Sequence, residues 1–597
     1  MCGLACIFTQ KEIINDDQLI YKMMDEVSNR GPDGEGFYKD NNIHLGHKRL
    51  SIIDLNSNSN QPFVWANRYV IVFNGEIYNY KFLKEKLQKK GFQFKTNSDT
   101  EVLIASFDYW GQECLNMLNG MWSFIIWDKK LKRLFACRDR FGIKPLYYSF
   151  SNNKLLISSE IKQINKALHI NSPNYDQLSV FLYTGISNFD NETCFKGINI
   201  LPAGSYLKIS LDKNLEIRKW YSLRDNLNYS SSINDLQYLL TDSIKLRMQS
   251  DRPVGYFLSG GLDSSTVCTY ASSIAQKNLI NIFHAKSADK EFDEFYFAKK
   301  CSEKLNCKLH KIVPSKEDFL QNINNISYLQ DEPFASTSIF MQYLLFKEAS
   351  QQGLKVILDG QGADEILLGY LRYLPLPLFE SLAKKDLKNI FKSLKDFIMT
   401  KSISSYKQKT QYFFGSLLSD LRTTRVNNKF NFVNLSISKS KYIYKEISSN
   451  LWDHQNTQIN EITKVSLPSL LRYADRNSMS NSVEVRLPFL DHRLVETCVS
   501  LSLNNKINKG WTKYALRNNK LLANEVAWRR SKLGFDSPER TWINHYQDIM
   551  YETILESKIM NNIVNQKILK NNWKTLSVRE KWRVFSVANW AKVMNIN

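Results

Sequence analysis

No run of about eighteen apolar residues occurs anywhere in the 597-residue sequence, so it contains no candidate membrane-spanning helix. The apolar residues 3–8 near the start are too few to form the hydrophobic region of a secretion signal. We therefore expect a cytoplasmic protein. Hydrophobic residues make up 43% of the chain and charged residues 23%, as in ordinary globular proteins, which excludes a disordered, collagenous or coiled-coil chain.

Cysteines are few, odd in number and scattered, and no two of them form a C-x-x-C pair. This distribution excludes a disulfide framework and a zinc cluster. The nine cysteines are Cys2, Cys6, Cys114, Cys137, Cys194, Cys268, Cys301, Cys307 and Cys498.

Acidic residues are outnumbered, with 59 Asp and Glu against 80 Lys and Arg, which gives a net charge of +21. A net positive charge of this size ordinarily suggests a nucleic acid as a binding partner, but here the surplus of basic residues is spread over the whole chain. Its densest part, residues 384–409, is interleaved with Ser, Phe and Leu. We interpret this segment as a solvated helical face rather than a phosphate-binding patch, and expect neither nucleic acid nor a membrane as a partner.

The chain divides into two parts with different patterning. In residues 2–205, short apolar runs such as 69–73 and 122–127 stand before Asn74-Gly75 and Asp128, and residues 80–90 have helical periodicity. This pattern predicts an α+β domain of antiparallel sheets between helices. We place a linker at residues 206–234, since residues 225–234 are polar.

A second domain is expected over residues 235–597. Its apolar runs at 254–258, 280–285 and 356–358 alternate with helical segments, which is typical of a doubly wound parallel sheet. From about residue 375 onward the pattern is mostly helical, without an internal repeat.

Cys2 follows the initiator methionine and precedes Gly3, so removal of the methionine would leave Cys2 as the first residue. Its thiol would then share a residue with an α-amine, whose pKa of about 7.7–8.0 lets it accept the thiol proton. This is the chemistry of an N-terminal nucleophile, although a cysteine at one position can also arise by chance.

Five segments within the first hundred or so residues strengthen this interpretation: MCGL at 1–4, RGPD at 30–33, GHKRLSI at 46–52, FNGEIYN at 73–79 and SDTE at 98–101. Together, in this order, they resemble the class II glutamine amidotransferase domain, an N-terminal nucleophile fold. Taken singly, the key residues have ordinary explanations: Arg49 as a surface arginine, Asn74-Gly75 as a hairpin turn and Asp99 as a helix cap.

The resemblance implies a role for each matching residue. Cys2 would attack the glutamine carboxamide, and the Asn74 side chain and the Gly75 backbone N–H would hold the oxyanion. Arg49 would bind the α-carboxylate of glutamine, while Glu76 and Asp99 would hold its α-ammonium.

The segment SGGLDSS at 259–265 leads from an apolar strand through glycines into a helix predicted to begin near Ser264. Backbone N–H groups at such a turn form an anion site. It is neither a Walker A loop nor G-x-G-x-x-G, and its plainest reading is a generic strand-to-helix turn. It resembles the loop of ATP pyrophosphatases, which implies ATP and Mg²⁺ as cofactors, with Asp263 on Mg²⁺ and further contacts to ATP from Leu258, Ser259, Gly260, Gly261, Ser264 and Ser265.

Three later segments fit the same resemblance. DGQGADE at 359–365 would supply Asp359 and Gly360 to ATP, Asp364 to the metal, and Gln361 and Glu365 to the acceptor. RYADRNSM at 472–479, which runs on to EVRLPFLD at 484–491, resembles the acceptor and interdomain segment and would place Asp475 near the acceptor. Lys513 matches a lysine that stabilises charge on the α-phosphate, although a lone lysine on a helix is ordinarily solvated.

A glutaminase fused to this second domain resembles the glutamine-hydrolysing asparagine synthetase family over nearly the whole chain. The resemblance implies that ammonia released at Cys2 crosses an internal tunnel to an aspartyl-adenylate made with Mg-ATP, so the substrates would be glutamine, aspartate and ATP. Separation of the two sites keeps ammonia unprotonated and the adenylate away from water. A homodimer is compatible with this family, and no feature of the sequence sets the oligomeric state.

Two departures from the family pattern bear on specificity. The small residues usual after the second strand are replaced by FHAK at 283–286, which affects the adenine-side contacts expected from Leu258 and Ala285. Position 361, often acidic in asparagine-forming members, is Gln. Residues 375–460 resemble the family least, and acceptor preference could reside there.

Three other interpretations remain open. A related amidotransferase could amidate another carboxylate, such as a sugar acid or a peptide, for a surface polysaccharide or a secondary metabolite. A basic RNA-binding protein that adenylates tRNA would leave the glutaminase half unexplained, and a gel shift at physiological salt tests it. A catalytically inactive regulatory homologue is disfavoured, because Cys2, Asp263, Asp364 and Lys513 are all present.

Overall fold

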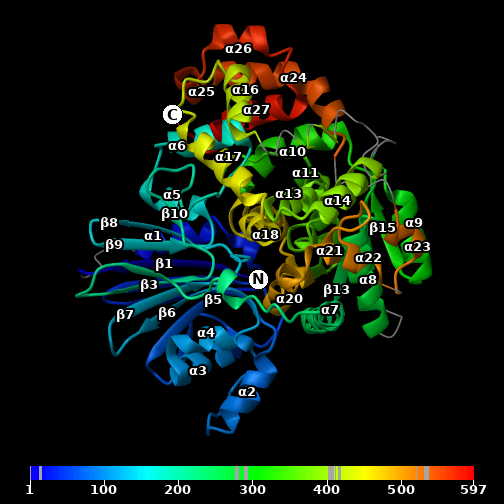
Figure 1. Ribbon diagram of the computed structural model, residues 1–597. Coiled ribbons are helices and arrows are strands. Elements are labelled where there is room, and N and C mark those ends of the chain that lie inside the picture. The colour runs from blue at the N-terminus through cyan, green and yellow to red at the C-terminus, as the bar shows by residue number, and fades with distance from the viewer. Residues whose placement is uncertain are drawn as a thin grey trace.

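The computed structural model describes residues 2–11, 17–275, 281–287, 293–400, 409–410, 412–413, 418–519, 521–529 and 537–596. Figure 1 shows a blue and cyan unit of sheets, a green unit with its own sheet, and red C-terminal helices that lie against the green unit. The chain begins where the first two units meet.

The N-terminal unit contains two six-stranded antiparallel sheets. The first has the order β10-β8-β9-β1-β3-β2, with β10 Asn199–Ile200, β8 Tyr147–Ser151, β9 Lys154–Ser158, β1 Gly3–Thr9, β3 Ile43–Arg49 and β2 Gly34–Asp40. The second has the order β12-β11-β7-β6-β5-β4, with β12 Glu216–Lys219, β11 Ser205–Ser210, β7 Arg133–Arg138, β6 Gly120–Asp128, β5 Tyr69–Ile77 and β4 Phe63–Trp65.

The two sheets pack face to face because their strands alternate between two apolar faces. On β1, Leu4 and Phe8 belong to a core shared with β5 and β6, whereas Ala5 and Ile7 face a core that includes helix α1, Asp17–Asp25. Helices α2, Tyr80–Gln88, and α3, Asp99–Trp110, cover the outer face of the second sheet. The expected α+β domain of antiparallel sheets between helices is confirmed.

One local prediction was wrong. Asn74-Gly75 does not end a strand, because β5 continues through both residues to Ile77 and pairs them with Ser123 and Trp122 of β6. A Cβ on Gly75 would lie 2.1 Å from the Met121 carbonyl oxygen. Glycine is therefore required here by the close approach of β6 rather than by a turn.

The segment 206–234, expected as a linker, contains most of β11 and all of β12. Both strands extend the second sheet, since β11 pairs with β7 and β12 pairs with β11. We therefore propose that the first domain continues through β12 and that the connection is confined to the residues before helix α7, Ile233–Arg247.

The second unit is built on a five-stranded parallel sheet with the order β15-β14-β13-β16-β17. Its strands are β15 Lys308–Ile312, β14 Asn281–Ala285, β13 Val254–Phe257, β16 Val356–Leu358 and β17 Glu484–Arg486. The chain winds from β13 to β14 on one side and later adds β16 on the other, so its direction switches between β13 and β16. In such sheets ligands bind outside the carboxyl ends of the strands at the switch.

Helices cover this sheet and form the rest of the chain. Those nearest the sheet are α8 Leu262–Ile274, α9 Phe295–Lys304, α10 Lys316–Leu329, α11 Ser338–Gln351 and the short α12 Ala363–Ile366. The region after the sheet crossing is helical, as predicted, and includes α13 Leu376–Ala383, α14 Leu387–Met399, α16 Ser419–Lys429, α17 Ser438–Asn450, α18 His454–Asn460, α19 Leu467–Met479, α20 His492–Ser500, α21 Leu503–Lys506, α22 Tyr514–Arg517, α24 Glu539–Glu556 and α27 Val578–Val593. Within the described ranges, none of the helices is both long and apolar enough to cross a bilayer.

Candidate active sites

The first site surrounds Cys2 at the start of β1. The backbone nitrogen of Cys2 donates a hydrogen bond to Asn74 Oδ1 at 3.0 Å. With Oδ1 so used, the amide nitrogen of Asn74 can donate to an oxyanion; its closest partner is Ser123 Oγ at 3.5 Å. A pocket of about 30 Å³ is lined by Cys2, Arg49, Gly75, Glu76 and Asp99, so the structure brings together five of the residues expected to bind glutamine.

Burial raises the pKa of the Cys2 thiol above its ordinary value. A thiol in this environment needs a base to become a nucleophile. Once the methionine is removed, the α-amine of Cys2 itself, which is hydrogen-bonded to Asn74, can serve as that base. The bond to Asn74 therefore positions the base as well as the nucleophile.

Arg49 is partly engaged by its own domain. Its guanidinium donates to the carbonyl oxygen of Asn56 and to Asn60 Oδ1, each at 2.8 Å, and to the carbonyl oxygen of Asp54. Three of the five N–H donors of an arginine are thus used, and two remain to bind a carboxylate. The role expected for Arg49 agrees with this count, and the loop that it holds closes one side of the pocket.

Glu76 and Asp99 form a buried acidic pair. Burial raises the pKa of the Glu76 carboxyl well above its ordinary value, and the charges of Glu484 and Asp99 raise it further. Burial likewise raises the pKa of Asp99 to about 6, although Asp99 Oδ2 accepts a hydrogen bond from the Ile77 N–H at 2.9 Å. An ammonium group that enters the pocket would favour the ionised acids, as expected for the α-ammonium of glutamine.

We expect the kcat/KM for glutamine to fall as the pH drops below about 6. Asp99 is ionised above this pKa and neutral below it, so the attraction for the α-ammonium is lost on the acid side. The measurement is a pH profile of glutamate release. Asp99→Asn should be less active and should lack the step near pH 6, whereas Asp108→Asn on the same helix should keep it; a step near pH 6 that persists in Asp99→Asn would contradict the assignment.

The second site lies at the carboxyl ends of β13 and β16. The loop after β13 is held by Ser259, whose Oγ accepts from the Gly261 N–H at 3.1 Å and lies 3.0 Å from Ser264 Oγ. Gly260 has φ +87°, and a Cβ there would meet backbone atoms of Glu294 and Ala298 at 2.9 Å. Helix α8 begins at Leu262, two residues before the predicted start, so its N-terminus is directed at this loop.

Asp263 and Asp364 come from different strand ends and meet at one cation. Lys513 Nζ lies 2.5 Å from Asp263 Oδ2 and 2.8 Å from Asp364 Oδ1. Burial lowers the pKa of Lys513, but the two carboxylates more than offset this and raise it above its ordinary value, so Lys513 is a buried cation. The three residues assigned separately from the sequence are therefore neighbours.

Gly369 is a site residue that the sequence analysis missed. A Cβ at this position would lie 1.9 Å from Lys513 Cε and 2.1 Å from Asp364 Oδ1. Any larger residue here would displace the end of the Lys513 or Asp364 side chain and so disturb their contact. No sequence signal identified it, because Gly369 follows the motif 359–365 by several residues.

The remaining residues of the 359–365 segment lie around the contact between Asp364 and Lys513. Burial raises the pKa of Asp359 to about 6, and a Cβ on Gly360 would lie 2.8 Å from the Ser264 backbone nitrogen. Burial and the charge of Asp364 raise the pKa of Glu365 to about 7, and Glu365 Oε1 accepts from the Tyr370 hydroxyl at 2.5 Å. Gln361 Oε1 is buried and has no hydrogen-bond partner in the described part of the chain.

The adenine-side residues Leu258 and Ala285 lie at adjacent strand ends. The Leu258 N–H donates to the carbonyl oxygen of Phe283 at 3.0 Å, and Ala285 is the last residue of β14. His284 Nδ1 lies 2.8 Å from the Leu258 carbonyl oxygen. His284, one of the residues that depart from the family pattern, thus contacts the segment expected to bind adenine.

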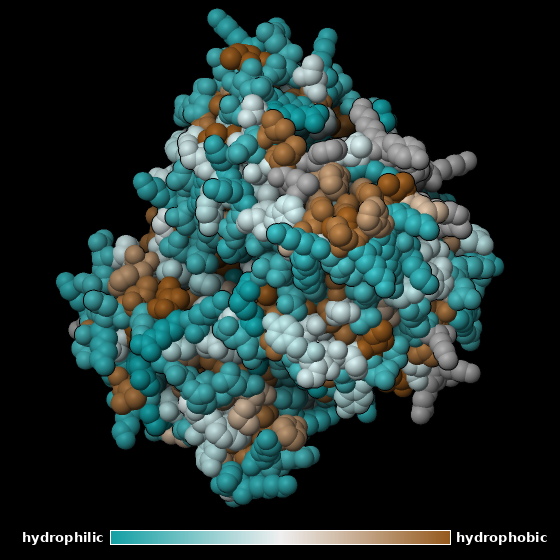
Figure 2. Space-filling model, viewed as in Figure 1, coloured by the Kyte–Doolittle hydropathy of each residue, from teal (hydrophilic) through white to brown (hydrophobic). Residues whose placement is uncertain are grey.

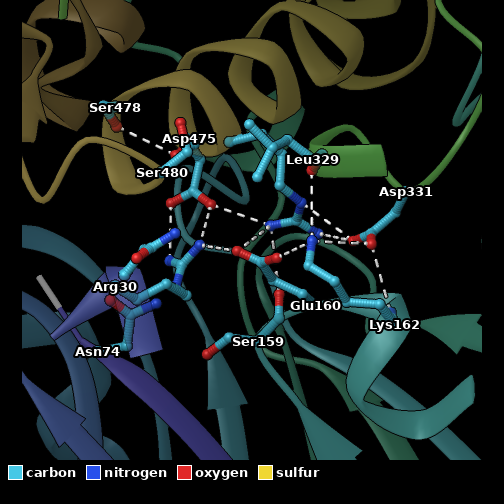
Figure 3. Close-up of polar contacts among 12 residues, drawn as sticks. Arg30, Asn74, Ser159, Glu160, Lys162, Leu329, Asp331, Asp475, Ser478 and Ser480 are labelled. Carbon is cyan, nitrogen blue, oxygen red and sulfur yellow. Dashed lines mark hydrogen bonds and ion pairs between the residues drawn. The ribbon is translucent and has the colours of Figure 1, made fainter. Parts of the chain in front are cut away.

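Asp475, from the segment expected near the acceptor and between the domains, lies at the interface between the domains (Figure 3). Its two carboxylate oxygens accept from Arg30 at 2.8 Å and 3.1 Å, and Arg30 Nε donates to the Cys2 carbonyl oxygen at 3.0 Å. Burial would raise the pKa of Asp475, but Arg30 holds it below its ordinary value. Asp475 therefore connects helix α19 to the residue that carries the nucleophile.

This contact belongs to a larger interdomain charge cluster, which we define as Arg30, Glu160, Lys162, Asp331, Asp475 and Arg476. Arg30 also bonds to Glu160 at 2.7 Å, and Asp331 pairs with Arg476 at 2.9 Å and with Lys162 at 3.1 Å. All six side chains are buried. Arg30 and Arg476 both lie within sequence motifs, but their roles could not be predicted because the pairing joins positions up to 445 residues apart.

Comparison with known proteins agrees with this division into two sites. The model of the glutamine amidotransferase domain matches residues 1–221, and that of asparagine synthase matches residues 235–592. Asparagine synthetase [glutamine-hydrolyzing] 1 of Bacillus subtilis (strain 168) is 30% identical over 93% of this chain and 90% of its own. A putative asparagine synthetase [glutamine-hydrolyzing] 2 of Methanocaldococcus jannaschii is 35% identical over 63% of this chain and 76% of its own, and amidase chry2 of Gibberella zeae is 27% identical over 91% and 90%. The chain therefore belongs to the asparagine synthase family and joins a glutamine amidotransferase domain to a synthetase domain.

Proposed function

We propose that this protein is a glutamine-dependent asparagine synthetase. It hydrolyses glutamine at Cys2, adenylates the side-chain carboxylate of aspartate with Mg-ATP, and transfers ammonia to give asparagine, AMP, pyrophosphate and glutamate. The observation that carries the proposal is the convergence of Asp263, Asp364 and Lys513 at the switch point of the parallel sheet, in a chain that also holds Cys2 in one pocket with Arg49, Glu76 and Asp99.

In the glutaminase half, the Cys2 nitrogen accepts the thiol proton and the thiolate attacks the carboxamide carbon. Asn74 Nδ2 and the Gly75 N–H stabilise the oxyanion. The Cys2 nitrogen then returns its proton to the amide nitrogen of the intermediate, which leaves as ammonia and gives a thioester. Water then hydrolyses the thioester to glutamate and regenerates the thiol.

The residues of the synthetase half fit Mg²⁺ and ATP. Asp263 Oδ1 is buried and has no hydrogen-bond partner in the described chain, while Asp263 Oδ2 and Asp364 Oδ1 share Lys513. One or two carboxylates together with substrate phosphates are the usual ligands of Mg²⁺, which when bound neutralises phosphate charge. Lys513 would stabilise charge on the α-phosphate, and the Ser259–Ser265 loop would hold the departing pyrophosphate.

Ammonia must then pass from the first domain to the second. A cavity of about 70 Å³ lies at the interface, where Ile143 and Tyr147 of the first domain face Leu471 and Asp475 of the second. Since Asp475 also bonds to Arg30 beside Cys2, this cavity begins close to the glutaminase site. Its position at the interface supports passage of ammonia between the two domains.

The test is an assay of the purified chain with glutamine, Mg-ATP and a panel of carboxylates, in which AMP, glutamate and the amidated product are quantified. Equal amounts of AMP and asparagine with aspartate are expected. AMP formation only with another carboxylate would instead favour the second candidate, an amidotransferase that acts on a sugar acid or a peptide. The neutral Gln361 at the acceptor loop is the observation that favours this second candidate.

Gln361→Glu is expected to accelerate asparagine formation. A carboxylate at this position can accept a proton from the attacking ammonia, whereas glutamine can only orient it by hydrogen bonds. The comparison is the rate of asparagine formation at saturating ATP, with Gln361→Leu as the control that removes hydrogen bonding altogether. If neither the wild type nor Gln361→Glu forms asparagine while another carboxylate supports ATP cleavage, aspartate is not the acceptor.

A further inference from the structure

Helix α14 is amphipathic, but its apolar side faces outward. Leu387 and Phe391 are each 71% exposed, Met399 is 65% exposed and Ile398 is 48% exposed. Within the helix only Phe397 is buried. The sequence pattern of the basic segment 384–409 predicts a solvated helical face, and its described helix is largely exposed, but the exposed side also carries large apolar residues; residues 401–408 lie outside the described chain.

The exposed apolar residues form one continuous stripe. Leu387, Phe391, Leu394 and Ile398 are spaced by three or four residues and therefore lie on one face of the helix. We define these four residues as the apolar stripe. Figure 2 shows brown side chains gathered over α14 on the outer surface, and Leu382 at the end of α13 is also exposed nearby in the sequence.

Lysines flank the stripe on one side. Lys388, Lys392 and Lys395 are exposed, and none of them has an ion-pair partner among the residues that the structure describes. Lys392 also lines, together with Asn389, Ser393 and Asp396, a groove that extends toward the turn at Gly510. The backbone N–H of Asn389 and, to a lesser degree, the nearby charge of Lys388 lower the pKa of the Asp386 carboxyl, and the three lysines present positive charge next to the apolar residues.

The apolar stripe and its flanking lysines together indicate what kind of surface binds α14. A second copy of the chain would bring together two basic surfaces of a protein with a net charge of +21, which like-charge repulsion disfavours. An anionic lipid surface instead supplies both complements, since its acyl region accepts Leu, Phe and Ile while its phosphates attract the flanking lysines. A 13-residue helix of this kind lies in the interface and does not span the bilayer.

We propose that α14 docks the protein on an anionic phospholipid surface, with the apolar stripe inserted at the boundary between headgroups and acyl chains and with Lys388, Lys392 and Lys395 at the phosphates. A contact links the end of α14 to the segment that carries Lys513. Thr400, which follows α14, donates a hydrogen bond at 2.8 Å to the carbonyl oxygen of Gly510, three residues before Lys513. The proposal does not depend on which carboxylate is amidated.

The test is co-sedimentation of the full chain with vesicles of phosphatidylcholine alone and with a fraction of phosphatidylglycerol. We expect partition into the anionic vesicles only, weakened by added salt. The double variant Leu387→Ser/Phe391→Ser and the triple variant Lys388→Gln/Lys392→Gln/Lys395→Gln should each reduce partition by about tenfold or more.

Matched controls come from the opposite end of the molecule. Phe82→Ser/Leu131→Ser removes two other exposed apolar side chains, and Lys81→Gln/Lys86→Gln/Lys89→Gln removes three exposed lysines of α2 and its end. Both controls should partition like the wild type, and ammonia-dependent AMP formation together with glutaminase activity in every variant verifies the folding of both domains. Absence of wild-type partition, equal loss in the controls, or a dimer in sedimentation velocity that only the α14 variants abolish would overturn the proposal.

Discussion

Replacement of Cys2 by alanine should abolish glutamine-dependent amidation, by at least about a thousandfold, while ammonium salts still support ATP-dependent synthesis. The reason is that Cys2 is needed only to release ammonia, whereas Asp263, Asp364 and Lys513 meet in the other domain. Glutamate release and AMP formation are measured on the same preparation, once with glutamine and once with ammonium chloride.

Cys2→Ser should also be poor with glutamine, since a hydroxyl is much less acidic than a thiol and this site is buried. Cys307→Ala, which removes a partly exposed thiol, is the matched control and should retain both activities. Equal loss of the glutamine- and ammonia-dependent activities in Cys2→Ala would refute a role confined to the first half-reaction.

Asp364→Asn and Asp263→Asn should each remove adenylation, by at least about a hundredfold, and leave glutaminase activity largely intact. Each change removes a negative charge from the group that would face Mg²⁺ and the triphosphate. Lys513 keeps its other carboxylate partner in either variant, so folding should suffer less than metal binding. A titration of AMP formation with Mg²⁺ should show a higher midpoint before activity is lost.

Asp420→Asn, at an exposed position of α16, is the control for loss of an acidic charge elsewhere in the same domain. A normal Mg²⁺ titration with retained AMP production in Asp364→Asn would place the second ligand on another residue. Circular dichroism and glutaminase activity distinguish loss of the site from loss of the fold.

The sequence predicted those parts of the molecule in which local pattern and chemistry agree. The apolar run 356–358 is β16, and runs 254–258 and 280–285 contain β13 and β14. The glycine-rich loop after β13 sits where a parallel sheet binds ligands. The grouping of Cys2, Arg49, Gly75, Glu76 and Asp99 in one pocket likewise agrees with the motifs that pointed to glutamine.

What could not be predicted depends on residues that are distant in the sequence. Asn74-Gly75 has the composition of a turn, yet β6 continues the pairing through it. Gly369 is required by the positions of Lys513 and Asp364, and no local pattern reports that contact. The outward stripe of α14 has the same periodicity as a buried one, so periodicity alone could not show which way the helix faces.

The interdomain charge cluster also has a consequence for how such proteins can be recombined. The first domain contributes Arg30, Glu160 and Lys162, and the second contributes Asp331, Asp475 and Arg476, so the excess positive charge of one half is balanced by the excess negative charge of the other. A buried charge that loses its partner costs about 3–5 kcal/mol. A chimaera that exchanged only one half with a relative would incur this cost unless both sides of each pair were inherited together, which restricts viable exchange to units that carry the matching charges.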